Sequence, residues 1–378
     1  MDIKTKLQQI CQGFRIQGEF IGFDHIKVGN VNQTYQVRFR KDNGIEKDYI
    51  VQEVNTYAFR RPKEVMHNID LVTEHIRAKK PGQVALHFHH TEDRLTYIFD
   101  KDGFWRLCNY IPSNTFSVCT DESVLRGTAE AFGEFQQLLA DFDATQLYET
   151  IYHFHDTPHR LADLFQSAHT DPMGRAEEIQ AELEYVHSIA EQACTLSYLR
   201  QDGKLPIRVT HNDTKINNVL FDPNTHQPVA VIDLDTVMPG LIAHDFGDAI
   251  RSAANPVGED CTDLSKVDCD LNVFRTFTMG FLSKTAAILT HHELQTLVLS
   301  PFVLAVELGS RFLDDYLQGN HYFHIDYPTH NLVRGRCQLE LSKRILEKMP
   351  QMEAIVKECY EQVMQHPNAS TSPLKFTI

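Results

Sequence analysis

The sequence predicts an α+β protein of two unequal lobes, a small β-rich N-terminal lobe over residues 1–111 and a large, mainly helical C-terminal lobe over residues 112–378. The chain has 378 residues, which exceeds the usual size of one domain. Its first part alternates apolar and polar residues as strands do, and most of its second part has helical periodicity. The composition, 42% hydrophobic and 23% charged, is typical of a globular protein and argues against disorder.

The N-terminal lobe is predicted to contain short strands and one helix. Tyr35, Val37 and Phe39 alternate with polar residues, which is typical of a half-buried strand. The turn at residues 42–44 favours a hairpin with the next strand. A helix is expected at Pro62–Lys79, with proline in its first turn and basic residues near its end. The strands are expected at residues 33–40, 49–54, 95–99 and 104–110.

The C-terminal lobe is predicted to be helical around a small β island. Helical periodicity covers residues 122–141, 175–200, 272–289, 295–317 and 332–365. Strands are expected at residues 207–210, 219–221 and 229–234. A cleft between two such lobes is the expected place for a ligand.

Charge and cysteine content restrict the function classes. The chain has 36 Lys and Arg against 51 Asp and Glu, a net charge of −15, which disfavours nucleic acid as a partner. Its eight cysteines form no CxxC pair, which favours a reducing compartment. No signal peptide is recognisable, and no stretch reaches the roughly 18 apolar residues of a membrane span. We therefore expect a cytoplasmic protein that has no membrane partner and for which no protein partner is implied.

One segment carries the strongest chemical signal. His211-Asn212-Asp213-Thr214-Lys215-Ile216-Asn217-Asn218 is followed by Asp233, which ends an apolar strand. Phosphoryl transfer needs a carboxylate that orients the acceptor hydroxyl, oxygen ligands for Mg²⁺, and a nearby positive charge. The alternative, that His211 and Asp213 merely hydrogen-bond a turn, would suit an isolated pair but not the complete set.

A second acidic motif lies further along the chain. Asp245-Phe246-Gly247 spells a kinase metal motif but precedes a helical run, so Asp245 is expected to be an N-cap. Asp233 is the better candidate for a metal ligand. Asp235 either shares a second ion or faces solvent, and the sequence leaves both interpretations open.

The stretch from His211 to Arg251 resembles the aminoglycoside phosphotransferase family of small-molecule kinases, and within it the N-acetylhexosamine 1-kinases. Segments 29–35, 154–157 and 307–317 are also similar, so the resemblance spans nearly the whole chain. It implies a two-lobed protein-kinase-like fold that uses ATP and Mg²⁺ to phosphorylate a sugar hydroxyl. The hydroxyl implied is the anomeric one of N-acetylglucosamine or N-acetylgalactosamine, giving the 1-phosphate.

The resemblance also implies roles for the residues of the catalytic segment. Asp213 is expected to be the catalytic base, and Lys215 to contact the γ-phosphate. Asn218 and Asp233 are expected to be the Mg²⁺ ligands.

On the nucleotide side, the resemblance implies a covering loop and an adenine-binding strand. The loop includes Gly29, Asn30 and Asn32, although it holds one glycine where three are usual. Asn109 and Ile111, at the end of an expected edge strand over residues 105–111, would present backbone groups to adenine.

The phosphate-binding lysine of kinases is missing from this sequence. Gln52 stands at its expected position, and an amide adds no charge. Either Glu64 or Glu74 could be the supporting helix carboxylate, and either could simply be solvated.

The acceptor site is predicted from a polar stripe and a short connecting segment. Glu307, Arg311 and Asp315 recur every four residues on an otherwise apolar helix. They form either an internal or surface ion-pair ladder or a wall facing a sugar, in which Arg311 is the candidate contact. His155 and Asp156 are further candidates, with a helix cap as the alternative for Asp156.

Three other functions remain open at this point. The same chemistry on choline, an amino alcohol or an aminoglycoside is the nearest, although Arg311 favours a neutral polyol. A nucleotide-binding pseudokinase scaffold is suggested by Gln52, and a metal-dependent hydrolase by His211 and Asp213. The sugar epimer, the oligomeric state, the use of GTP and the rate-limiting step are not determined by the sequence.

Overall fold

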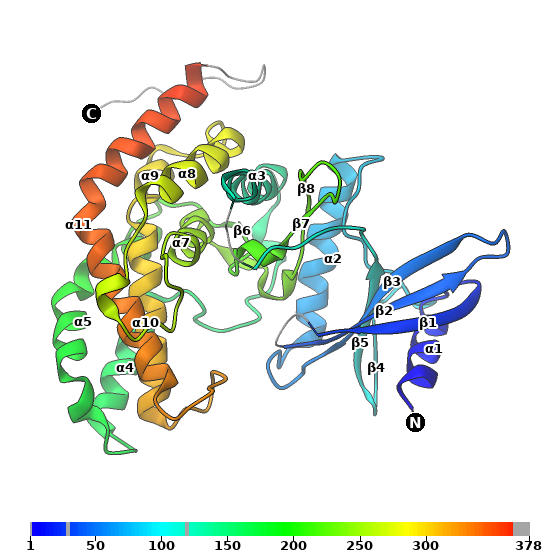
Figure 1. The fold of residues 1–378 in the computed structure, drawn as a ribbon, viewed down its shortest axis with the longest axis horizontal. Coiled ribbons are helices and arrows are strands. Elements are labelled where there is room, and N and C mark those ends of the chain that lie inside the picture. Colours follow the sequence, from blue (N-terminus) through cyan, green and yellow to red (C-terminus); the bar gives the residue numbers. More distant parts are fainter. Residues whose placement is uncertain (1, 28–30, 118–120, 366–378) are drawn as a thin grey trace. The chain divides into compact units, whose positions relative to one another are not determined.

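The computed structural model describes residues 2–27, 31–117 and 121–365, which form two compact units (Figure 1). Unit 1 comprises Met1–Asn114, Asp141–Ile151 and Leu220–Met238. Unit 2 comprises Thr115–Ala140, Tyr152–Val219 and Pro239–Ile378. Unit 1 is built around an antiparallel sheet and unit 2 mainly from helices, so the predicted α+β class is confirmed.

The sheet of unit 1 has the strand order β1-β2-β3-β5-β4 and is antiparallel throughout. Val37, Val51 and Leu107 are fully buried on one face, and they pack in one cluster with Leu7 and Cys11 of helix α1 (Ile3–Gly13). The alternating pattern therefore has the physical cause expected for a sheet that buries one face. The strands are β1 (Glu19–Ile26), β2 (Gln33–Arg40), β3 (Glu46–Val54), β4 (Tyr97–Asp100) and β5 (Gly103–Asn109).

Helix α2 has the predicted bounds, Pro62–Lys79. Proline occupies its first turn, and Arg77 and Lys79 lie in its last turn, where cations interact favourably with the exposed carbonyl groups. Helix α1 and strand β1 were not among the predicted elements.

Strand β5 corrects one prediction. We expected residues 105–111 to form an edge strand, but β5 lies between β3 and β4. Beyond the end of the short β4, the backbone of residues 87–89 bonds to the same side of β5. Residues 104–108 are all buried, so β5 buries both of its faces, which suits an inner strand.

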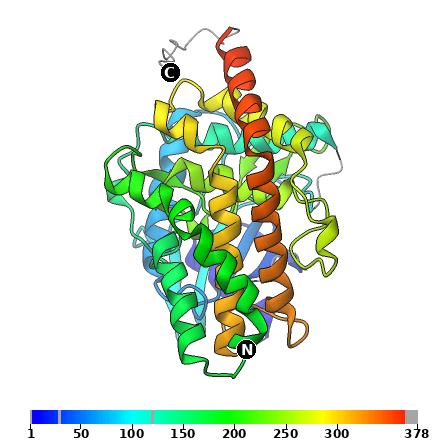
Figure 2. The ribbon, with the colours of Figure 1, turned by 90° about the vertical axis from the view of Figure 1, so that its left-hand side faces the viewer.

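Unit 2 is organised around helices α10 (Ser300–Gln318) and α11 (His330–Gln365), which lie side by side (Figure 2). Their close approach depends on glycine: a Cβ atom added at Gly335 would lie 2.7 Å from the Leu313 side chain. Helices α3 (Glu122–Leu138), α7 (Ile242–Ala253) and α8 (Leu271–Thr285) share the same apolar core. No helix among the described residues is both long enough and apolar enough to cross a membrane.

Two predicted helices are interrupted. The run at 175–200 consists of a short 3-10 turn at Ala176–Ile179, α5 (Gln180–Ala193) and α6 (Thr195–Gln201). The run at 295–317 divides into α9 (His291–Thr296) and α10, which has Pro301 in its first turn. Helix α4 (Thr157–Thr170) was not predicted.

The β island forms two short strand pairs. β6 (Arg208–Thr210) pairs with β9 (Met238–Gly240), and β7 (Val219–Phe221) pairs with β8 (Pro228–Val231). The three strands expected here are present, although β8 ends at Val231, before the expected end at residue 234, and the segment that begins at His211 follows β6 directly.

Candidate active site

Helix α7 holds the loop that follows β6 through hydrogen bonds to the loop backbone. Asp245 of this helix accepts the backbone N–H groups of His211 and Asn212 at 2.9 and 2.8 Å, and the Gln136 amide at 2.6 Å. Burial raises the pKa of Asp245, although these hydrogen bonds oppose the shift. The loop needs this support because Asn212 has a left-handed backbone, with φ +66°.

This position of Asp245 corrects the expectation that it caps the helix. The N-cap of α7 is Leu241, and Asp245 lies within the first turn with 1% of its surface exposed. Asp245 therefore fixes the backbone of the catalytic loop. The local sequence could not reveal this role, because the bonded groups lie more than thirty residues away.

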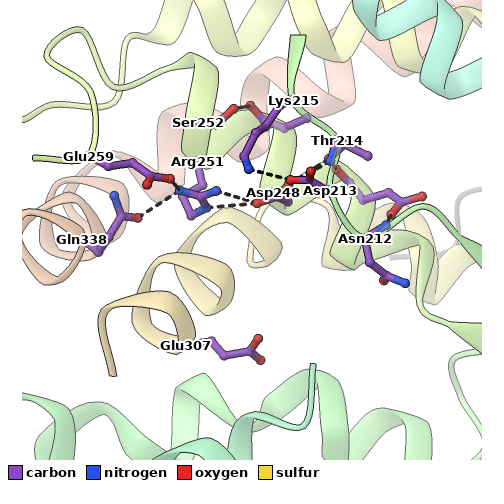
Figure 3. A network of polar contacts seen from close by, with 12 residues as sticks. Asn212, Asp213, Thr214, Lys215, Asp248, Arg251, Ser252, Glu259, Glu307 and Gln338 are labelled. Carbon is purple, nitrogen blue, oxygen red and sulfur yellow. Dashed lines mark hydrogen bonds and ion pairs between the residues drawn. The ribbon is translucent and has the colours of Figure 1, made fainter. Parts of the chain in front are cut away.

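Three predicted residues come together on this loop. The ammonium group of Lys215 lies 2.8 Å from Oδ1 of Asp213 (Figure 3). Asn218 donates through Nδ2 to the Asp213 carbonyl at 2.8 Å and to its Oδ2 at 3.1 Å. The side chains of Asp213 and Lys215 are 27% and 47% exposed, so both are accessible to a substrate.

Two carboxylates set the charge state of Lys215. Its burial would lower the pKa of Lys215, but the negative charges of Asp213 and Asp248 raise it above its usual value. The ammonium group therefore stays charged at neutral pH, which suits an interaction with a phosphate.

The side-chain oxygens of Asn218 and Asp233 are suitable ligands for Mg²⁺. Both hydrogen bonds of the Asn218 side chain use Nδ2, which leaves the amide oxygen for a hard cation. Asp233 belongs to unit 1 and follows β8 in a left-handed conformation, with φ +60°. A carboxylate and an amide oxygen are ligands that Mg²⁺ prefers.

A buried ion-pair network continues from the catalytic loop in unit 2 (Figure 3). Asp248 accepts the backbone N–H of Thr214 at 2.9 Å and the Arg251 guanidinium at 2.7 Å. Arg251 also donates to Glu259 at 2.5 Å and to Gln338 at 3.5 Å. Burial would raise the pKa of Glu259, but the positive charge of Arg251 lowers it. The sequence analysis did not predict this network. The two charged residues Asp248 and Arg251 in an otherwise apolar helical run were the available signal.

On the nucleotide side, four of the six candidate residues lie in the described part of the chain. Gly29 and Asn30 lie outside the described residues. Gln52 donates to the Thr34 hydroxyl at 3.0 Å and accepts from Nε of Arg106 at 2.9 Å. Asn32 donates to Asp235 at 2.7 Å. Both side chains are therefore engaged within unit 1.

Asp235 does not face solvent, which excludes one of the two interpretations left open by the sequence. It is 2% exposed, and both of its carboxylate oxygens accept hydrogen bonds from the Arg106 guanidinium. Neither Arg106 nor its pairing with Asp235 was predicted. An arginine inside the apolar strand Trp105–Asn109 was the available signal, because a buried arginine needs a carboxylate partner.

The expected adenine-binding residues lie at the end of β5. The backbone N–H of Asn109 donates to the His87 carbonyl at 3.1 Å. The Ile111 carbonyl accepts the Ser113 hydroxyl at 2.9 Å. Of the two helix carboxylates, Glu64 pairs with Arg61 and Glu74 with Arg77, each within α2 or at its start.

The first part of the acceptor prediction lies where α4 begins. His155 contacts Oε1 of Glu307 through Nδ1 at 2.7 Å, and the Thr157 hydroxyl donates to Oε2 at 3.0 Å. Nε2 of His155 is buried and has no hydrogen-bond partner in the structure. Asp156 caps α4 by accepting the His159 N–H at 3.3 Å, as its alternative interpretation states.

The three residues of the polar stripe on α10, Glu307, Arg311 and Asp315, have different partners. Asp315 accepts the backbone N–H groups of residues 321–323 and so shapes the loop after α10. The guanidinium carbon of Arg311 lies 5.2, 5.6 and 5.4 Å from the ring centres of Phe154, Tyr322 and Phe323, which is cation–π distance. Glu307 and Asp315 are thus internal anchors, and Arg311 is held among aromatic rings.

Comparisons with known proteins identify the family of the chain. Residues 25–263 match the family described as "Phosphotransferase enzyme family", which is well over half of the chain. Spectinomycin phosphotransferase APH(9)-Ia, solved with ADP and spectinomycin, superposes with a TM-score of 0.54 at 11% identity over 97% of this chain and 99% of that chain.

Two further structures show the same fold. The ethanolamine kinase of Plasmodium vivax has a TM-score of 0.51 at 15% identity, covering 83% of this chain and 80% of that one. APH(2")-IIa, solved in a ternary complex with streptomycin and ATP, has a TM-score of 0.51 at 13% identity over 92% and 98%. At such identities the likeness shows the fold alone, and it confirms the expected kinase-like architecture.

Proposed function

The chain belongs to the Phosphotransferase enzyme family, and we propose that it transfers the γ-phosphate of ATP to a sugar hydroxyl. The acceptor that we propose is the anomeric hydroxyl of N-acetylglucosamine or N-acetylgalactosamine, which gives the 1-phosphate. The observation that carries the proposal is the joint placement of Asp213, Lys215 and Asn218 on one fixed loop. The assignment to N-acetylhexosamine draws on the resemblance of the sequence.

In this proposal Asp213 performs the proton transfer. Its carboxylate orients the acceptor hydroxyl towards the phosphate and accepts the hydroxyl proton. Lys215 lies 2.8 Å from the same carboxylate, so its ammonium group is placed to compensate charge on the transferred phosphoryl group. Because Lys215 is about half exposed, at 47%, it can move between the carboxylate and a phosphate.

We propose that Asn218 and Asp233 hold Mg²⁺, which when bound neutralises the charge of the nucleotide phosphates. Asn218 serves a second purpose, because its Nδ2 holds the Asp213 side chain at 3.1 Å. The same residue thus orients the base and offers an oxygen to the cation.

The positive charge of Arg311 favours an uncharged acceptor, such as a sugar, over a cationic one. The rings of Phe154, Tyr322 and Phe323 surround its guanidinium group, and a site for choline or an aminoglycoside would need such rings for the ligand's own cation. A second cation close to Arg311 would be repelled. A sugar hydroxyl or N-acetyl oxygen can instead accept a hydrogen bond from a guanidinium N–H.

A panel of acceptors tests this proposal. ADP formation is measured with N-acetylglucosamine, N-acetylgalactosamine, choline, ethanolamine and spectinomycin, with the Asp213→Asn protein as control for contaminating kinases. We expect turnover with an N-acetylhexosamine and a ³¹P signal coupled to the anomeric proton of the product. Preferential turnover of choline or spectinomycin would refute the sugar assignment. ADP formation that is absent with every acceptor would favour the scaffold alternative, and hydrolysis that needs no nucleotide would favour a hydrolase.

A further inference from the structure

Gln52, which stands where kinases carry the phosphate-binding lysine, has Arg106 as its neighbour in the sheet. Strands β3 and β5 are antiparallel, and their register places Gln52 opposite Arg106. Residues opposite each other on neighbouring strands lie close enough for their side chains to interact. The amide of Gln52 bonds to Nε of Arg106 at 2.9 Å, so the neutral residue on β3 orients a cation on β5.

Arg106 is a buried cation with a single carboxylate partner among its hydrogen bonds. It is 3% exposed, and both terminal nitrogens of its guanidinium group donate to Asp235. A paired fork of this kind fixes the orientation of the carboxylate as well as its distance. Arg106 is thus closed off from solvent, and the carboxylates of Asp235 and, more weakly, Asp233 both act electrostatically on its guanidinium group.

Asp235 links three segments of unit 1. In addition to Arg106 it accepts the Asn32 amide at 2.7 Å, and Asn32 in turn accepts the backbone N–H of Asn55 at 3.0 Å. Asp235 lies in the short 3-10 turn Leu234–Thr236, whose N-cap is Asp233.

The backbone of Asp233 needs such support. Its φ of +60° and ψ of 55° are left-handed, a conformation that costs energy in any residue with a Cβ atom. A strained backbone of this kind persists where the surrounding contacts determine it. Asp235, fixed on both oxygens two residues later, supplies contacts of that kind.

We propose that Arg106 is a positioning residue of the nucleotide site, which through Asp235 sets the turn that presents Asp233 to the nucleotide-bound cation. In this arrangement the sheet keeps the buried positive charge that kinases place on β3, but carries it on β5. The inference rests on the proposed function in taking Asp233 as a Mg²⁺ ligand. It assigns to Asn32 and Gln52 the task of holding this pair, in place of direct contact with the nucleotide.

Binding of ADP to the whole 378-residue chain, with and without Mg²⁺, tests the proposal without any turnover. Arg106→Gln should weaken the binding of ADP in the presence of Mg²⁺ by roughly 10- to 100-fold, as the loss of a residue that orients a metal ligand does. ADP without Mg²⁺ should bind almost as it does to the unaltered protein. Arg106→Lys, which keeps the charge, should recover part of the loss.

The double exchange Gln52→Lys with Arg106→Gln is the sharper variant, because it returns the cation to β3. We expect it to bind ADP with Mg²⁺ more tightly than Arg106→Gln alone. Arg38→Gln is the matched control, since Arg38 is a partly exposed arginine of the same sheet, its side chain 40% exposed, and pairs with Asp48 at 3.2 Å. It should leave both affinities unchanged.

Several outcomes would overturn the proposal. A folded Arg106→Gln protein with unchanged affinity for ADP and Mg²⁺ would do so, as would an equal loss with and without Mg²⁺. If Arg106→Gln does not fold, Asp235→Asn and Arg106→Lys are measured in the same way, with the same expectation of a loss confined to the Mg²⁺ condition. An unaltered protein that binds no ADP would instead overturn the proposed function.

Discussion

Asp213 has hydrogen-bonding partners on both carboxylate oxygens. Lys215 lies 2.8 Å from Oδ1, and Asn218 donates to Oδ2 at 3.1 Å. These contacts restrict the orientation of the carboxylate, which suits the general base that we propose.

Replacement of Asp213 by Asn should separate catalysis from binding. The amide keeps the shape of the side chain but cannot accept the hydroxyl proton, so kcat should fall roughly 10²- to 10⁴-fold. ADP affinity should change little, because Lys215 and Asn218 remain. Asp202→Asn is the control, an exposed loop aspartate paired with Lys204 at 3.1 Å. Activity in Asp213→Asn comparable with that of the control would refute the base assignment.

The local part of the site was predictable, whereas the partners that hold it were not. Asp213, Lys215 and Asn218 lie within one short loop, so their spacing in the sequence fixes their proximity. Asp235 has Arg106 as its partner, 129 residues away in the chain, and sequence spacing carries no information on such a pair. The burial of Asp235, which is 2% exposed, excluded the interpretation that it faces solvent, and the sequence could not show this burial.

Helix α7 connects the catalytic loop to helix α11 through charged side chains. Asp248 bonds to the backbone of Thr214 at 2.9 Å, and Arg251 reaches Glu259 at 2.5 Å and Gln338 at 3.5 Å. Removing one member of a buried ion pair leaves the other charge uncompensated, which costs more than the pair contributes.

Glu259→Gln should make stability less dependent on pH at the acid end. The lowered pKa of folded Glu259 means that its charge stabilises the native state above the unfolded pKa, about 4.3, and that this contribution is lost as pH falls through the lower, folded pKa. The variant should melt at a lower temperature than the unaltered protein at pH 7, and the difference should shrink below about pH 4. Thermal unfolding followed by circular dichroism measures both. A difference that stays constant across this range would contradict the assignment.

The contact between α10 and α11 makes a steric prediction. Gly335→Ala would place a methyl group 2.7 Å from the Leu313 side chain, so either that side chain or the helices must shift. We expect a loss of about 1–3 kcal/mol in the free energy of unfolding, typical of overpacking in a core. Glu353→Ala, at an exposed position of the same helix, should change it little. Denaturant unfolding of both variants measures the effect, and equal stability would show that the helices separate freely.

Most helices of unit 2 were predictable, whereas α4 and the interruption at Cys194 were not. The apolar period runs on through Cys194, which ends α5 and begins α6, because both helices bury residues on the same core. Pro350 lies inside α11, where a proline usually marks a break. The predicted run at 332–365 nevertheless continues through Pro350, as α11 does, so the local pattern was sufficient there but not at Cys194.

The charge of the whole chain should affect its two proposed substrates differently. The net charge of −15 repels an anionic nucleotide over a distance that salt shortens to about 10 Å at 0.1 M. Raising the salt concentration from low to moderate should therefore lower KM for ATP, while KM for a neutral sugar should stay constant. A KM for the acceptor that rises steeply with salt would indicate a cationic acceptor and contradict the proposed one.

The fold class could be predicted from the sequence, because apolar residues alternate as in strands in the first part of the chain and recur with helical periodicity in most of the second. The membership of the two units did not follow, since Asp141–Ile151 and Leu220–Met238 belong to unit 1 by their contacts alone. Asn68 shows the physical reason: this buried side chain of α2 bonds to Tyr148 and to the Val237 carbonyl, both far along the chain.

The chain crosses from one unit to the other five times. No single cut can therefore yield two complete halves. A fragment that stops at residue 114 would retain Arg106 but lose Asp235, and would bury a guanidinium group without its counter-ion. Any exchange of unit 1 with the corresponding part of a relative, in evolution or in the laboratory, must transfer three separated stretches at once.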